Sequence, residues 1–290
     1  MGTDKAQGEA GWFTGEKWMV ATGLLGFALA LMCGVWALIG GAEMPPDGNL
    51  WKAFSFNAAL GIFMLSTAAI SPLSGMGRKG RAFFRWSYIV LALYSYFLET
   101  VQNIRGVNPR FAENGSTFDI IAAGVFGLVA LLLAGYYLLF AIQFFKRTTY
   151  EANPELVLGI RYAMVSIMVA FAGGISISMN GGRFIGAEGN LIWLHGMGFH
   201  AIQALPFIAW LAVGSALPAA FRRTLIHVSG IAFFLGLLAM GWQTLLGRPL
   251  LEWSALPLAA AACFILVTAA GARSLFAERQ RRSDGKGISA

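Results

Sequence analysis

Eight long apolar runs, separated by short breaks rich in glycine, proline and charge, constrain this chain more than any other feature. A helix needs about 20 mostly apolar residues to cross the hydrocarbon core of a bilayer, and each run has about this length. The apolar residues are continuous and do not alternate with polar ones, as they would in a transmembrane barrel. The expected fold class is all-α, a polytopic transmembrane helical bundle. Its eight predicted spans are Trp18–Ile39, Lys52–Ile70, Ala82–Arg105, Phe118–Phe145, Glu155–Asn180, Leu191–Ala216, Arg223–Leu246 and Ser254–Ala277.

The composition agrees with a membrane protein, since 57% of the residues are hydrophobic and 12% are charged. No polar stretch is long enough for an appended soluble domain, so residues 1–290 are expected to form a single integral membrane domain. Residues 1–16 form a short N-terminus, and the first apolar run is too long for the core of a cleaved signal peptide. Cys33 and Cys263 lie in the middle of apolar runs and are expected to be small buried residues, not a disulfide.

The basic residues are distributed unevenly between alternate loops. Most lie in the N-terminus, in the C-terminal tail (278–290) and in the loops that share their side, and the exceptions are Lys52, Arg105, Arg110, Arg183 and Arg248. The positive-inside rule therefore predicts that both termini are cytoplasmic and that the number of spans is even. We expect a multi-pass protein of the bacterial cytoplasmic (inner) membrane. The basic tail is expected to lie against anionic lipid headgroups, with no nucleic-acid partner.

Three outward-running helices end in similar segments, "ETVQNIRGVNPRF", "SISMNGGRF" and "WQTLLGRP". The similarity is compatible with a duplication, although the sequence shows no longer internal match. Arg105, Arg183 and Arg248 each lie beside a glycine in these segments. They could bind an anion, or they could anchor the helix ends at the outer headgroups by snorkelling.

The third run carries a polar stripe. At 100° per residue, Tyr88, Ser95, Glu99, Gln102 and Asn103 fall on one face. Such a face is expected to point into the bundle or into a water-filled cavity. Glu99 is the acidic residue deepest inside a predicted span, which makes it a candidate for a functional site. The alternative is that a protonated Glu99 only holds neighbouring helices together.

The sixth run, "IWLHGMGFHAIQALPF", holds two of the three histidines. His195 and His200 border one arc of the helix with Gln203 between them, and their spacing of five is poor for shared ligation. From a rise of 1.5 Å per residue, His195 lies ~7 Å and Glu99 ~9 Å inside the outer boundary. His227 lies near the inner boundary, where we expect a hydrogen bond between helices.

The segments "ETVQNIRGVNPRF" and "LHGMGFHAIQALP" together resemble a family of bacterial polytopic membrane proteins of no known activity. Members pair an acid–x–x–Gln–x–x–Arg–Gly segment with a His–x4–His–Ala–x–Gln–x–x–Pro segment. The resemblance covers about 26 of the 290 residues. It implies that Glu99, Gln102, Arg105, His195, His200 and Gln203 are the positions that matter, and it implies no reaction.

These residues predict an outward-facing polar pocket in the membrane that binds a small ligand, a metal ion or a lipid-soluble substrate. Glu99 and His195 could act as a catalytic acid–base pair. Glu99, His195 and His200 could hold a single metal ion, and a haem held by His200 and His227 is a weaker possibility. A transporter or channel for a small, anionic solute and a structural or assembly subunit also remain open. The candidate ligand-binding residues are Gln102, Asn103, Arg105, Arg183, His200, Gln203 and Arg248.

Overall fold

A computed structural model describes residues 12–112 and 115–286 of the chain. It confirms the all-α class, because the strands among the described residues form only two short hairpins. The chain divides into two compact units, residues 1–136 and 137–290. Most of the N-terminal segment 1–16 and the last four residues of the basic tail lie outside the described residues.

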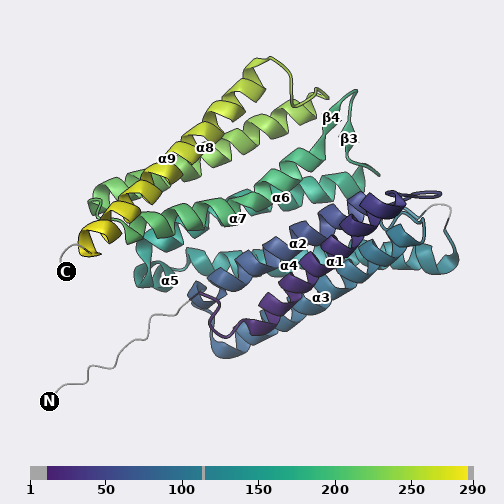
Figure 1. Cartoon of the computed structure of the whole chain (residues 1–290), viewed down its shortest axis with the longest axis horizontal. Helices are drawn as coiled ribbons and strands as arrows, with labels where there is room; N and C mark the ends of the chain where they lie inside the picture. Colours follow the sequence, from purple (N-terminus) through teal and green to yellow (C-terminus); the bar gives the residue numbers. More distant parts are fainter. Residues whose placement is uncertain (1–11, 113–114, 287–290) are drawn as a thin grey trace. The chain divides into compact units, whose positions relative to one another are not determined.

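Unit 1 is built from helices that pack in sequence order (Figure 1). Two helices are joined by a hairpin, and a third helix packs against both of them. The fourth helix begins in this unit and crosses into the next. The elements are α1 (Lys17–Gly40), β1 (Glu43–Met44), β2 (Gly48–Asn49), α2 (Leu50–Ile70), the 3-10 helix η1 (Ser71–Leu73), α3 (Arg78–Ile104) and α4 (Thr117–Phe145).

Unit 2 repeats this order after the end of α4. Its core combines Ala163, Leu205, Phe233 and Val267, one residue from each of its four long helices. Figure 1 shows the second hairpin at the ends of α6 and α7. The elements are α5 (Arg147–Ala152), α6 (Pro154–Met179), β3 (Phe184–Ile185), β4 (Gly189–Asn190), α7 (Leu191–Gly214), α8 (Ala219–Leu245) and α9 (Ala255–Lys286).

Seven helices in the described part of the chain are long and apolar enough to cross a membrane. They are α1, α2 with η1, α4, α6, α7, α8 and α9, so the chain is a multi-pass membrane protein. The remaining long helix, α3, has 27 residues but is less apolar than the others. Its five stripe residues, Tyr88, Ser95, Glu99, Gln102 and Asn103, are all buried, which confirms that this polar face points inward.

The two units are repeats with a constant offset in the sequence. α2 begins at Leu50 and α7 at Leu191, which are 141 residues apart. The ranges of α3, Arg78–Ile104, and α8, Ala219–Leu245, differ by the same 141 residues at both ends. The two hairpins also share one register, since Glu43 pairs with Asn49 in the first and Phe184 with Asn190 in the second. The chain is therefore an internal duplication.

Backbone hydrogen bonds repeat with the same offset. Gly106, after α3, accepts a hydrogen bond from the Asp47 amide of the first hairpin at 2.9 Å. Gly247, after α8, accepts one from the Glu188 amide of the second hairpin at 3.0 Å. Both glycines have a positive φ, 76° and 71°, which glycine adopts at little cost. Each hairpin is thus bonded to the end of the third helix of its own repeat.

The duplication corrects the expectation drawn from the three similar helix ends. The end of α3 corresponds to the end of α8, but the end of α6 corresponds to the end of α1. Few side chains are shared, so the sequence alone showed no longer match. The shared residues include Gly41 and Gly182, Asn49 and Asn190, Ser74 and Ser215, Arg81 and Arg222, and Gln102 and Gln243.

Candidate functional site

The hairpin end of unit 1 is closed by a buried carboxylate, Asp119, in the first turn of α4. Gln102 Nε2 donates to Asp119 Oδ1 at 2.8 Å, and Arg105 Nη1 donates to the same oxygen at 2.7 Å. Ser116 donates from its amide and its hydroxyl to Asp119 Oδ2. Because these donors satisfy both oxygens, Asp119 ties the end of α3 to the start of α4.

Unit 2 builds the same closure with different positions. Gln243 Nε2 donates to Glu252 Oε2 at 2.7 Å, and Arg248 is ion-paired with Glu252 Oε1. Arg105 and Arg248, two of the predicted anion ligands, are therefore both paired with a carboxylate of their own repeat. The third, Arg183, is exposed, and its guanidinium lies 5.0 Å from the ring centre of Phe184. The recurrence of the Gln–carboxylate–Arg cluster favours a structural role for it.

Glu99 lies beneath this closure in unit 1 and is fully buried. Its carboxylate is ion-paired with Arg110, whose side chain is 37% exposed. Asn103 Nδ2 donates to the Glu99 carbonyl at 2.7 Å and lies 3.4 Å from Glu99 Oε2. The Arg110 guanidinium also lies 5.5 Å from the ring centre of Phe56 and 5.9 Å from that of Phe126. The arginine thus places a cation over the buried carboxylate from the outer side.

The second repeat serves as an internal control for this ion pair. With the offset of 141 residues, Met240 takes the position of Glu99 and Leu251 that of Arg110. Met240 is buried, as Glu99 is, and α8 ends with the same backbone bonds as α3. The hairpin and helix junction therefore forms in unit 2 without a buried ion pair. A buried ion pair costs desolvation that apolar residues avoid.

Two further buried polar atoms lie on the same part of α3. Asn57 of α2 donates to Thr100 Oγ1 at 2.9 Å, but its Oδ1 has no hydrogen-bond partner among the described residues. The buried hydroxyl of Tyr96, one turn before Thr100, also has none there. Buried polar groups are almost always bonded, so these atoms call for a partner that is not a protein side chain. Gly198 and Leu237 occupy the corresponding positions in unit 2.

His195 is held in a defined orientation within unit 2. Its Nδ1 lies 2.8 Å from the Ala170 carbonyl oxygen of α6. A carbonyl only accepts, so Nδ1 carries the proton in the neutral ring and the lone pair is on Nε2. Gly174 makes room for the ring, since a Cβ there would lie 2.6 Å from His195 Cε1. At the corresponding position unit 1 has Phe54.

The other two histidines have separate partners. His200 is exposed on α7, and its Nδ1 lies 3.2 Å from Gln203 Oε1. His227 lies 2.8 Å from the Tyr162 hydroxyl of α6, which confirms the expected hydrogen bond between helices. No group of three or more His, Cys, Asp and Glu side chains in the described ranges is placed to hold a metal ion. Because Glu99 belongs to unit 1 and His195 to unit 2, their pairing as acid and base stays a prediction.

Comparisons of the chain with family models, with curated proteins and with solved structures find no match. The duplication within the chain is therefore the comparison that bears on function. It separates residues that both repeats need from residues that only one of them has. Glu99, Arg110, Asn57 and His195 belong to the second group.

Sequence reasoning missed the residues that complete these clusters. Arg110 was counted only as a basic residue on the outer side, and Asp119 and Glu252 were not considered. Gln102 and Gln243, each three or four residues before a glycine that ends the helix, were the available signal of equivalence. The distance from glutamine to carboxylate, 17 residues in one repeat and 9 in the other, hid the match.

Proposed function

We propose that this chain is a membrane protein that binds a small polar ligand beside Glu99, in the outer half of unit 1. Glu99, Asn57 and Tyr96 would contact the ligand, and Arg110 would cover it from the outer side. The observation that supports the proposal is that the second repeat folds in the same way with Met240 and Leu251 in place of Glu99 and Arg110. A costly feature that the fold does not need is expected to serve a ligand.

The proposed topology has eight spans with both termini in the cytoplasm. In it, α3 crosses the membrane as the eighth span, because its 27 residues reach ~40 Å at 1.5 Å per residue and its polar face is buried. Its counterpart α8 is one of the seven apolar helices, which supports the same role for α3. The positive-inside distribution supports a bacterial inner membrane.

The ligand is expected to carry a hydrogen-bond donor or a positive charge toward Glu99. Asn57 Oδ1 requires a donor, and the Tyr96 hydroxyl can donate to an acceptor on the same molecule. His195, with its lone pair on Nε2, is the residue of unit 2 that we propose as a proton acceptor if the site is catalytic. Gln102, Asn103 and Arg105 then position Glu99 and the end of α3 around the ligand.

Transport of a small solute is the second candidate, and the duplication favours it. Two repeats of four long helices each run in the same direction through the membrane in the eight-span topology, because an even number of spans separates their starts. Parallel repeats of this kind are one of the two arrangements from which secondary transporters are built. A structural or assembly subunit gains no comparable observation.

The experiment compares the wild-type protein with Glu99→Met/Arg110→Leu, which gives unit 1 the residues that unit 2 has at these positions. Small molecules retained by each purified protein are identified by mass spectrometry, and metal content is measured by elemental analysis. We expect a molecule that the wild-type protein retains and the variant loses. Equal retention of every molecule by the two proteins would refute the ligand site. One equivalent of metal that is lost in His195→Ala would instead establish a metal centre.

A further inference from the structure

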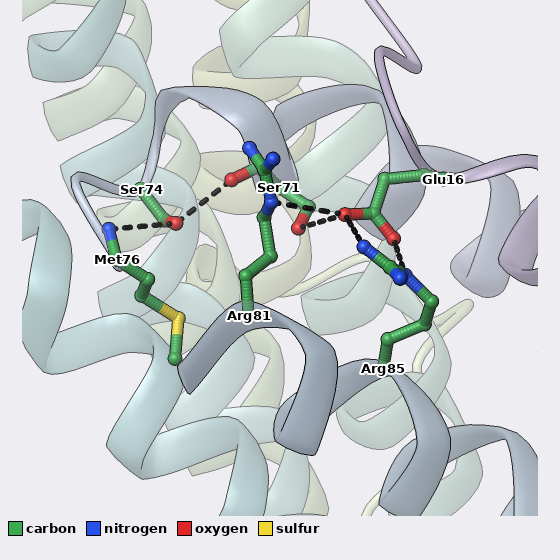
Figure 2. A network of polar contacts seen from close by, with 6 residues as sticks. All are labelled: Glu16, Ser71, Ser74, Met76, Arg81 and Arg85. Carbon is green, nitrogen blue, oxygen red and sulfur yellow. Dashed lines mark hydrogen bonds and ion pairs between the residues drawn. The ribbon is translucent and has the colours of Figure 1, made fainter. Parts of the chain in front are cut away.

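The end of unit 1 opposite its hairpin contains a clamp formed by Glu16, just before α1. This carboxylate is fully buried and accepts from Arg85 Nε at 2.6 Å and from Ser71 Oγ at 3.1 Å (Figure 2). Arg81 Nε lies 3.5 Å from it. Glu16 is the carboxylate found at this end among the described residues of unit 1, since the others lie on the hairpin side. One negative charge therefore faces two arginines, and one positive charge is left over.

An open groove of about 830 Å³ lies beside the clamp. One part is lined by Lys17, Arg85 and the rings of Trp18 and Trp86, whose centres are 6.1 Å apart. The other part is lined by apolar side chains of α1 and α2, among them Val20, Leu24 and Leu65. The two tryptophans are 52% and 49% exposed, in the position where tryptophan meets a membrane interface. The groove thus offers a charged end and an apolar wall.

The second repeat shows that this lining is not required by the fold. Both repeats keep the clamp: Glu155 accepts from Arg222 Nε at 2.8 Å, and Arg222 corresponds to Arg81. The groove residues of α3 are not kept, because Ile226 stands at the position of Arg85 and His227 at that of Trp86. The cationic and aromatic lining therefore belongs to unit 1 alone.

We infer that this groove binds an anionic glycerophospholipid, with the phosphate near Lys17 and Arg85 and an acyl chain along Val20, Leu24 and Leu65. Excess positive charge beside an apolar wall fits an anionic headgroup that is attached to an acyl chain. A zwitterionic choline lipid fits less well, because Lys17 Nζ already lies 5.5 Å from the ring centre of Trp18 and supplies the cation for that ring. The inference does not depend on the ligand site at Glu99.

The test measures lipid bound to the full-length protein by native mass spectrometry, with phosphatidylglycerol and phosphatidylcholine offered in equal amounts. We expect phosphatidylglycerol to be retained in preference. Lys17→Gln should lower its retention about fivefold, which corresponds to the ~1 kcal/mol that a cation near an anionic surface contributes. The matched control is Lys79→Gln, which removes an exposed lysine at the same end of the unit that does not line the groove, and it should leave retention unchanged.

A second measurement follows the acyl chain. Phosphatidylglycerol with brominated acyl chains should quench tryptophan fluorescence, and Trp86→Leu should remove part of the quenching that Lys17→Gln also weakens. Equal retention of the two lipids would overturn the inference, and so would equal losses in Lys17→Gln and Lys79→Gln, which would show only general attraction to surface charge. Retention of free inorganic phosphate without quenching by the brominated lipid would also overturn it.

Discussion

Breaking the ion pair between Glu99 and Arg110 from its two sides should have unequal effects on stability. Arg110→Leu leaves a fully buried carboxylate without its cation. Removal of one partner of a buried pair typically costs 3–5 kcal/mol. Because the Arg110 side chain is 37% exposed, solvent already screens part of the interaction, and we expect a loss of about 1–3 kcal/mol. Glu99→Met leaves an arginine that can reach water, so its cost should stay below about 1 kcal/mol.

The double substitution Glu99→Met/Arg110→Leu gives unit 1 the residues found in unit 2. Replacing a buried pair by apolar residues of similar size is often neutral or stabilising by about 1–4 kcal/mol, so the double variant should be at least as stable as the wild-type protein. The measurement is unfolding in detergent micelles by added sodium dodecyl sulfate, followed by far-ultraviolet circular dichroism. The four proteins form a double-mutant cycle that gives the coupling free energy.

The result that would refute this reasoning is a double variant as unstable as Arg110→Leu. Glu99 would then hold α3 to its neighbours as a structural residue, and the comparison with Met240 would not identify a ligand site. An Arg110→Leu variant as stable as the wild-type protein would show that the carboxyl group is protonated and needs no cation. Both outcomes differ from the expected order, in which Arg110→Leu alone is clearly destabilised.

Three further predictions test the repeat, the imidazole and the topology. Gly106→Ala should destabilise the protein by more than about 2 kcal/mol, because its φ is 76° and a Cβ would lie 2.0 Å from the Pro45 carbonyl oxygen, whereas Gly196→Ala in open space should be neutral or slightly stabilising in the same unfolding assay. His195→Phe, which introduces the residue of the first repeat, should change stability by no more than about 1 kcal/mol but abolish any activity; a fully active variant would exclude His195 as a proton acceptor. Single cysteines introduced beside Arg105 should react with a membrane-impermeant thiol reagent from outside intact cells and those beside Arg78 should not, and the reverse pattern would overturn the orientation.

The spans and the inward face of α3 could be predicted from the sequence because both depend on local patterns. Continuous apolar residues over about 20 positions indicate a helix in lipid regardless of what packs against it. The face shared by Tyr88, Ser95 and Glu99 follows from 100° per residue, and polar side chains avoid lipid. His227 could be assigned to a hydrogen bond between helices for the same reason.

The partners of these side chains were decided by the tertiary structure. Arg110 and Asp119 come from the connection after α3 and from the start of α4, and no helical period relates them to Glu99 or Gln102. Only a folded connection determines which cation covers Glu99 and which carboxylate binds Gln102. The predicted ligand residues Gln102, Arg105 and Arg248 proved to be bonded to carboxylates of their own repeats for this reason.

The duplication also required the tertiary structure, although it is encoded in the sequence. In a membrane helix many apolar residues satisfy the same position, so Leu237 can replace Tyr96 and Met240 can replace Glu99 while the helix keeps its course. What cannot change is the backbone geometry where a hairpin meets a helix end, and there Gly106 and Gly247 recur. The sequence by itself determined the helices and their buried faces, because these depend on the solvent around each helix. The tertiary structure decided which residues meet and showed that one plan was used twice, because those properties depend on contacts between distant segments.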